Sequence, residues 1–243
     1  MNEDRLYIDE KLGDEPFRFD DSVAAVFPDM LRRSIPGYAA SLEAIGSLAA
    51  RYVKEGTNCY DLGCSLGAAT LAMRQGIRAR GCRIIAIDNA VAMIDRCAQV
   101  IARDDAVTPV ELVLGDIQDA GMSNASMVVM NYTLQFLPVE GRERMLQKIC
   151  DGLNPGGLLL LSEKVVDVDP HMEALLVELH HEHKRRNAYS ELEISRKRAA
   201  LEDVLIPESV AAHRERLSRV GFAHSAVWLR YFNFVSIVAI KAA

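Results

Sequence analysis

The stretch of sequence that decides the fold runs from Cys59 to Thr70 and reads CYDLGCSLGAAT. Its first residues predict a short β-strand, whereas residues 68–79 carry apolar side chains at helical spacing. Between them, Gly63 and Gly67 allow the backbone to turn sharply and to approach a ligand closely. A strand, a glycine loop and a helix in this order are typical of a nucleotide-binding unit, although a plain tight turn also accounts for the two glycines.

Strands and helices alternate through the residues that follow. The hydrophobic pattern predicts strands at 83–88, 110–114, 126–131 and 158–162, and helices at 91–103 and 139–153, with a helix stop signal at 154–157. This alternation indicates βαβ units, and the near-continuous apolar strands fit burial on both faces. We therefore expect an α/β fold with a mostly parallel, doubly wound sheet.

Three further segments flank this pattern. Residues 39–52 predict a helix with Ser41 as its cap, and residues 169–203 predict a helical insert. Two β runs at 226–230 and 234–241 are so close in sequence that they must pair antiparallel, because a parallel return needs a longer crossover. A parallel sheet that ends in an antiparallel hairpin differs from a plain dinucleotide-binding fold.

Length and composition predict one domain over residues 1–243. Of the 243 residues, 50% are apolar, which is enough to bury a full core. No apolar run reaches the roughly 18 residues that a membrane-spanning helix needs. Residues 1–20 form a polar, acidic segment without the apolar region of a secretory signal, so we expect a loose N-terminal arm and a cytoplasmic protein.

Charge and metal-binding residue types argue against other classes of function. The five cysteines include no C-x-x-C pair, and on a helix His180 and His183 would share a face without an evident third ligand, so we predict no metal site. The net charge of −6 disfavours binding to nucleic acid through its phosphates. We accordingly read the basic runs at 184–186 and 196–198 as a solvated face or a charged site rim, without direct tRNA binding.

The glycine loop and the acid after the second strand suggest which cofactor binds. Asp88 lies 21 residues after Gly67 and can hold both hydroxyls of a ribose, or it can cap the helix that begins near Val91. Gly63 and Gly67 form G-x-x-x-G rather than the dinucleotide pattern G-x-G-x-x-G. Asp61 can meet an ammonium group, which suits a cofactor that carries an amino acid better than a diphosphate.

A similar argument applies to the third strand, where Asp116 offers a carboxylate to an adenine amine and Ile117 offers an apolar wall. Together these features resemble the nucleotide-binding motifs of the class I S-adenosylmethionine-dependent methyltransferases, as does the terminal hairpin. That resemblance implies a Rossmann-like methyltransferase fold that binds S-adenosylmethionine.

A closer resemblance covers nearly the whole chain. The stretches VFPDM (26–30), SIPGY (34–38), YDLGCSLGAAT (60–70), IAIDN (85–89), NYTLQFL (131–137), LNPGG (153–157) and YSELEISRKR (189–198) resemble the carboxy-S-adenosyl-L-methionine synthases, bacterial enzymes of tRNA wobble-uridine modification. The resemblance implies that S-adenosylmethionine and prephenate are converted to carboxy-S-adenosylmethionine and phenylpyruvate. It further implies a homodimer and a second enzyme that transfers the carboxymethyl group to tRNA.

The same resemblance implies a set of ligand contacts. Carried over residue by residue, they fall on Tyr38, Gly63, Cys64, Ser65, Asp88, Asn89, Asp116, Ile117, Asn131 and Arg198. We expect Arg198 to be the catalytic residue, because a guanidinium would repel the sulfonium of S-adenosylmethionine but can grip a carboxymethyl sulfonium with two parallel hydrogen bonds. Composition alone favours reading Arg198 as a solvated helix charge, and it is the resemblance that favours the binding role.

Two other functions remain open from the sequence. An ordinary methyltransferase that acts on a small acid or on tRNA would yield S-adenosylhomocysteine and would tolerate the loss of Arg198. A non-catalytic module would bind S-adenosylmethionine tightly without turnover. The fold alone does not separate these functions from the synthase.

Overall fold

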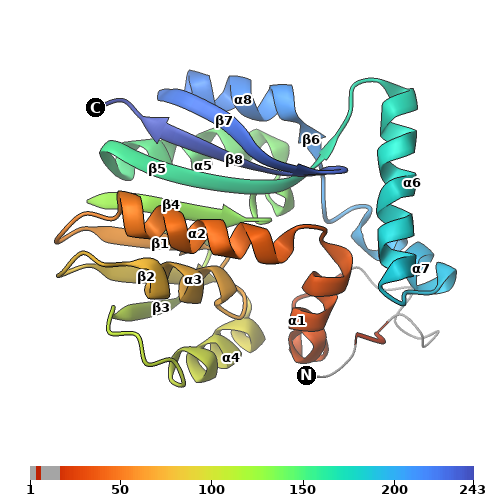
Figure 1. Cartoon of the computed structure of the whole chain (residues 1–243), viewed down its shortest axis with the longest axis horizontal. Coiled ribbons are helices and arrows are strands. Elements are labelled where there is room, and N and C mark those ends of the chain that lie inside the picture. Colours follow the sequence, from red (N-terminus) through yellow and green to blue (C-terminus); the bar gives the residue numbers. More distant parts are fainter. Residues whose placement is uncertain (1–3, 7–16) are drawn as a thin grey trace.

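The computed structural model describes residues 4–6 and 17–243, and its centre is a single mixed sheet (Figure 1). The strand order is β3-β2-β1-β4-β5-β8-β7, and a short strand, β6, pairs with β5. The strands are β1 (Asn58–Leu62), β2 (Arg83–Asp88), β3 (Val110–Leu114), β4 (Ala125–Asn131), β5 (Leu153–Val166), β6 (Glu208–Ser209), β7 (Phe222–Tyr231) and β8 (Phe234–Lys241). All pairs are parallel except β5 with β8 and β7 with β8, so the prediction of a parallel sheet finished by an antiparallel hairpin is confirmed.

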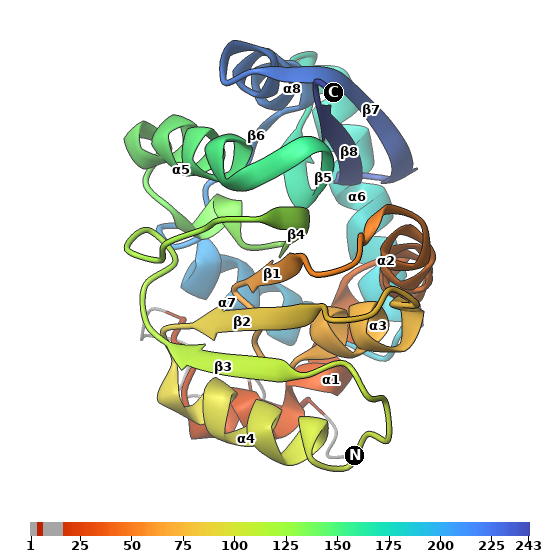
Figure 2. The ribbon, with the colours of Figure 1, turned by 90° about the vertical axis from the view of Figure 1, so that its left-hand side faces the viewer.

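Helices cover both faces of the sheet, as a doubly wound fold requires (Figure 2). Apolar side chains of α2 (Tyr38–Tyr52) and α3 (Ala68–Gly76) pack on one face, and those of α5 (Val139–Gly152) and α8 (Val210–Arg219) pack on the other. The helix α4 (Val91–Ile101) packs on β2 and β3 through Cys97. Alternate residues of the central strands enter the two cores, which explains why these strands are apolar throughout.

Three more helices stand beyond the end of the sheet toward which the β4 arrow points in Figure 1. They are α1 (Asp21–Ser34), α6 (Pro170–Arg186) and α7 (Glu191–Leu201). The helical insert predicted at 169–203 is therefore confirmed as α6 and α7. Each of these helices has a side-chain cap: Asp20 accepts from Val23 N–H, Asp169 accepts from His171 N–H, and Ser190 forms a capping box with Glu193.

Some element boundaries differ from the prediction. Ser41 does not cap α2, because the helix begins at Tyr38 after Gly37, and the Ser41 hydroxyl donates to the Tyr38 carbonyl inside the first turn (2.7 Å). The helices predicted to end at 79 and 103 end at Gly76 and Ile101. The fifth strand is longer than predicted and includes the segment 154–157 that we read as a helix stop. Leu153 already pairs with Ala125 of β4, and the pairing with β4 and β8 continues from Leu158, so the strand extends to both sides of that segment.

The prediction of a loose N-terminal arm is wrong at Asp4. This residue is 1% exposed, and its carboxylate accepts hydrogen bonds from the hydroxyl of Tyr189 and from Nζ of Lys197 (3.5 Å). Arg33 of α1 also donates to the Asp4 carbonyl (3.0 Å) and lies over the Tyr189 ring. Residues 1–3 and 7–16 of the predicted arm lie outside the described residues. Among the described helices, none is long and apolar enough to cross a membrane.

Candidate functional site

The glycine loop after β1 is held tightly at the carboxyl end of the sheet. Backbone N–H groups of Gly63 and Cys64 both donate to the Ile87 carbonyl of β2, at 2.8 and 2.9 Å. Gly63 has φ +78°, and a Cβ there would lie 2.4 Å from Cγ2 of Thr133. A side chain at this position would therefore meet both backbone strain and a clash, so the sequence needs glycine here.

Asp88 connects this loop to the start of α4. Its Oδ2 accepts from the N–H of Ser65, which has φ +48°, and its Oδ1 accepts from the N–H of Ala90, each at 2.9 Å. Burial raises the pKa of the Asp88 carboxyl, and these N–H bonds oppose that rise. Asp88 thus bonds to the backbone at the start of α4, as one of the two readings predicted. Each carboxylate oxygen has a second lone pair, so Asp88 can still accept hydrogen bonds from a ligand.

Asp61 is a buried carboxylate with only one satisfied oxygen. Oδ2 accepts a 2.5 Å hydrogen bond from the Thr70 hydroxyl, whereas the buried Oδ1 has no partner among the residues that the structure describes. Burial raises the pKa of Asp61 to about 6. A buried acceptor without a donor is costly, so the geometry fits a site that a cation or an N–H donor of a ligand completes.

Tyr38 lies near Asp61, and Tyr132 and Asn131 follow from the neighbouring strand β4. Burial, and then the negative charge of Asp61, raise the pKa of the Tyr38 hydroxyl, and the Tyr38 ring lies 6.5 Å from the ring of Tyr132. The Oδ1 of Asn131, at the end of β4, is buried and has no partner in the described part of the chain. Sequence reasoning missed Tyr132, although it directly follows the predicted Asn131.

The remaining predicted contacts extend along the same edge of the sheet. Asp116 follows β3 and is exposed, with its Oδ1 accepting from the N–H of Gln118 (2.8 Å), while Ile117 beside it is buried. Asn89 is exposed next to Asp88. The neighbouring strands β3, β2, β1 and β4 thus carry these polar residues at their carboxyl ends, where open α/β sheets bind ligands.

Arg198 comes to this region from α7. It is exposed, and its guanidinium forms no ion pair within residues 4–6 and 17–243. Burial lowers the pKa of Lys164 on β5, and the positive charge of Arg198 adds to that lowering. The charge of Arg198 therefore acts on β5, the strand that pairs with β4. Because the guanidinium has no ion-pair partner in the described chain, it can bind an anionic ligand.

Two side chains that could carry other chemistry, Cys64 and His180, are both buried. The Cys64 thiol is buried, and a hydrogen bond with Cys97, together with burial, raises its pKa, which disfavours a thiolate nucleophile. The ring of His180 is buried and its Nε2 lies 2.9 Å from the Ser34 carbonyl, and burial lowers its pKa to about 2. No group of three or more metal-ligating side chains occurs in the described ranges.

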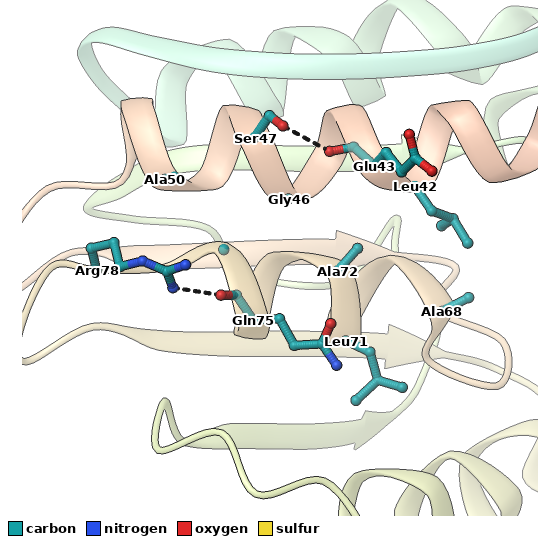
Figure 3. Close-up of a pocket in the computed structure, with 11 residues that line it drawn as sticks. Leu42, Glu43, Gly46, Ser47, Ala50, Ala68, Leu71, Ala72, Gln75 and Arg78 are labelled. Atoms are coloured by element: carbon teal, nitrogen blue, oxygen red, sulfur yellow. Dashed lines mark hydrogen bonds between the residues drawn. The ribbon is translucent and has the colours of Figure 1, made fainter.

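A separate groove of about 620 Å³ lies on the outer surface between α2 and α3 (Figure 3). The two helices lie close together beneath it, since a Cβ at Gly76 would be 2.1 Å from the Gly46 carbonyl oxygen. Some of its polar groups already have partners, for example the Ser47 hydroxyl, which donates to the Glu43 carbonyl at 3.0 Å. None of the predicted ligand contacts lines this groove, so we assign it no part in the site.

Comparison with known sequences identifies the relatives of the chain. A family model described as a methyltransferase domain matches residues 60–157. A carboxy-S-adenosyl-L-methionine synthase of Geobacter sp. (strain M21) is 55% identical over 226 residues, which cover 93% of each chain. The synthase of Shewanella sp. (strain ANA-3) is 52% identical over 99% of each chain.

Comparison with solved structures supports the fold. A putative S-adenosyl-L-methionine-dependent methyltransferase of Methanococcus maripaludis matches with a TM-score of 0.60 at 18% identity, over 95% of this chain and 97% of that one. Human N-acetylserotonin methyltransferase, in complex with SAM, matches with a TM-score of 0.62 at 17% identity, over 100% of this chain and 61% of that one. The fold is thus that of the methyltransferases, and the sequence identity over almost its full length shows that the chain belongs to the carboxy-S-adenosyl-L-methionine synthase family.

Proposed function

We propose that the protein converts S-adenosyl-L-methionine and prephenate to carboxy-S-adenosyl-L-methionine and phenylpyruvate. The observation that carries this proposal is the exposed Arg198 guanidinium, which has no ion-pair partner in the described chain and is close enough to Lys164 to lower its pKa. A guanidinium near the reactive end would repel a sulfonium. It becomes favourable once that end carries a carboxylate, which an ordinary methyltransferase never forms.

The site residues have distinct parts in binding S-adenosylmethionine. Asp61 faces the ammonium group with its unpaired Oδ1, and the loop of Gly63, Cys64 and Ser65 lines the methionine end. Asp88 and Asn89 hold the ribose, Asp116 accepts from the adenine amine, and Ile117 packs on the adenine ring. Tyr38 and Asn131 lie over the sulfonium end. This assignment is supported by the two buried acceptors, Asp61 Oδ1 and Asn131 Oδ1, that have no donor within the described residues.

The reaction balances without an external oxidant or base. The ring carboxylate of prephenate leaves as carbon dioxide, and the electron pair of the broken C–C bond aromatises the ring and expels hydroxide, which leaves phenylpyruvate. The hydroxide takes a proton from the sulfonium methyl group and becomes water. The methyl carbanion then forms a C–C bond to the carbon dioxide.

The wider setting follows from the product. A carboxymethyl sulfonium is an activated donor, so a second enzyme must consume it, and we propose that this enzyme modifies the wobble uridine of tRNA. We infer a homodimer, as the resemblance to the family implies, and a cytoplasmic location. The net charge of −6 supports release of a small-molecule product over direct binding of tRNA by this chain.

A mass spectrum of the small molecule released from the purified protein tests the proposal. We expect a species that is heavier than S-adenosylmethionine by one carbon dioxide, and the protein supplied with S-adenosylmethionine and prephenate should form phenylpyruvate in equal amount. Arg198→Ala should lose the heavier species and still bind S-adenosylmethionine, whereas Arg214→Ala, which removes an exposed arginine on α8, should retain it. Formation of S-adenosylhomocysteine with an acceptor, and no heavier species, would instead identify a methyltransferase.

A further inference from the structure

Two lysines near the carboxyl end of the sheet lack the partners that buried cations need. Lys184 on α6 is 8% exposed, and Lys164 on β5 is half-buried; neither ammonium group has a hydrogen-bond acceptor or an ion-pair partner in the described part of the chain. Lys197 on α7 gives the contrast, since it lies 3.1 Å from the Ser34 hydroxyl and 3.5 Å from the Asp4 carboxylate. An unpaired buried ammonium is destabilising, so its persistence points to an anion that binds there.

The unpaired lysines belong to one cluster of positive charge. Burial lowers the pKa of Lys184 to about 7, and the charges of Lys197 and Lys164 lower it further, against the opposing charge of Asp4. Burial lowers the pKa of Lys164; the negative charge of Glu173 opposes this shift, and the positive charge of Arg198 adds to it. The geometry agrees, because His180 of α6 and Lys197 of α7 both bond to Ser34, at 2.9 and 3.1 Å. The His180 ring also contacts Phe234, which lies opposite Lys164 of β5. Positive side chains from β5, α6 and α7 therefore converge, although the protein as a whole is acidic.

A row of rings leads from the cofactor end of the site to this cluster. Lys164 pairs with Phe234 across the antiparallel strands β5 and β8, so both side chains lie on one face of the sheet. The Phe234 ring contacts Tyr132 (5.9 Å between centroids) and His180 (4.8 Å), and Tyr132 lies against Tyr38. An unsaturated six-membered ring that carries carboxylates matches this combination of flat side chains and cations.

We propose that Lys164 and Lys184 bind the carboxylate of the second substrate that stays on the product. This inference rests on the proposed function, in which that substrate is prephenate, a dianion. Strong ionic contacts to the ring carboxylate would stabilise the ground state and oppose its departure as neutral carbon dioxide. The lysines therefore hold the pyruvyl carboxylate and fix the position of the ring. The leaving carboxylate faces the sulfonium methyl group, and Arg198 binds this carboxylate only after its transfer.

Lys184→Met and Lys164→Met test the inference, since methionine keeps the length of the side chain and removes its charge. We expect the KM for prephenate to rise about 10- to 100-fold, the effect of one lost charge-assisted contact, with the Kd for S-adenosylmethionine unchanged. Phenylpyruvate retains the pyruvyl carboxylate, so it should inhibit the wild-type enzyme in competition with prephenate, with a Ki that rises in parallel. Lys184→Arg should keep most of the affinity, and Lys54→Met, at an exposed lysine, should change neither constant.

Thermal unfolding separates this binding role from a structural one. Because the ammonium of Lys184 is buried and has no counterion in the described ranges, Lys184→Met should have a Tm equal to or above that of the wild type. Loss of folding, or an unchanged KM for prephenate and Ki for phenylpyruvate, would overturn the inference. If the wild-type protein forms no carboxy-S-adenosylmethionine, the proposed function fails separately. The lysine site is then judged by whether phenylpyruvate raises the Tm of the wild type and not that of Lys184→Met.

Discussion

The Thr70 hydroxyl donates a 2.5 Å hydrogen bond to Oδ2 of Asp61, and Oδ1 of the same carboxylate is buried without a partner in the part of the chain that the structure describes. The helix α3 thus orients a carboxylate of β1 and leaves one of its oxygens available. A negative charge buried in this way lowers the free energy of unfolding of the ligand-free protein. It also strengthens the attraction for a cationic group of a ligand.

Asp61→Asn should separate these two effects. Loss of the charge is expected to raise the Kd for S-adenosylmethionine about 10- to 100-fold, because the ammonium group loses a charge-assisted hydrogen bond. The ligand-free protein should not lose stability, since asparagine carries no buried charge. Isothermal titration and urea unfolding measure the two quantities, and Asp95→Asn, at an exposed position on α4, is the matched control. Unchanged affinity would exclude Asp61 from the cofactor site.

The pH dependence of stability should also trace to Asp61. Burial raises its pKa in the folded protein to about 6, above the usual 3.8, so the ligand-free folded state takes up a proton more readily than the unfolded state. The contribution of Asp61 to stability is therefore greatest below about pH 4 and falls as the pH rises through 6, by on the order of 2–3 kcal/mol. Affinity for S-adenosylmethionine should change in the opposite sense and weaken below pH 6. Asp61→Asn should flatten both profiles, and wild-type profiles that match those of the variant would contradict this assignment.

The hydrophobic pattern of short segments predicted the central strands and the loop between the first strand and helix. The strands at 83–88 and 110–114 were predicted with their observed bounds, because strands covered on both faces are apolar along their whole length. The glycine loop and Asp88 were also predictable, since the turn itself requires glycine and the acid follows at a fixed distance along the βαβ unit.

Features that depend on distant parts of the chain were not predictable. Tyr189 bonds to Asp4, which is 185 positions away, and no local signal reveals that contact. Lys164 and Lys184 look like ordinary surface lysines in the sequence. Only the folded chain shows that Lys184 is buried, that Lys164 is half-buried, and that neither has an ion-pair partner among the described residues. Tyr132 was missed for a similar reason: the aromatic row depends on how β4, β5 and β8 align.

Gly63→Ala should disrupt the loop by two separable mechanisms. The positive φ of +78° disfavours any side chain, and the added Cβ would lie 2.4 Å from Cγ2 and 2.5 Å from Oγ1 of Thr133. We expect a loss of about 2–4 kcal/mol in the free energy of unfolding. The double variant Gly63→Ala/Thr133→Ala removes both clashing atoms and should recover part of the loss, whereas Gly121→Ala, where an added Cβ meets no atom within 4 Å, should cost little. Absence of any recovery would leave backbone strain as the whole cause.

Cys64→Ala should retain most of the synthase activity, although Cys64 lies within the proposed cofactor loop. Its backbone N–H donates to Ile87 and its carbonyl accepts from Gly67, and alanine preserves both contacts. The raised pKa of the buried thiol keeps it protonated at neutral pH. We expect kcat within a few-fold of the wild type, a loss of about 1 kcal/mol in stability from the vacated volume, and resistance of the wild type to alkylating reagents. A loss of kcat by a hundredfold with S-adenosylmethionine still bound would assign the thiol a chemical role.

Asp4→Asn should weaken the connection between the N-terminal segment and α7, the helix that carries Arg198. The Asp4 carboxylate accepts from Tyr189 and from Lys197, so removing its charge leaves the buried Lys197 without its counterion. We expect a loss of about 3 kcal/mol in the free energy of unfolding, measured in urea, and Asp105→Asn, at an exposed position, should have no such effect. Because Arg198 adjoins Lys197 on α7, the variant should also retain carboxy-S-adenosylmethionine less tightly while its Kd for S-adenosylmethionine stays the same. Equal weakening of both ligands would mean that Asp4 supports the whole cofactor site rather than the position of Arg198.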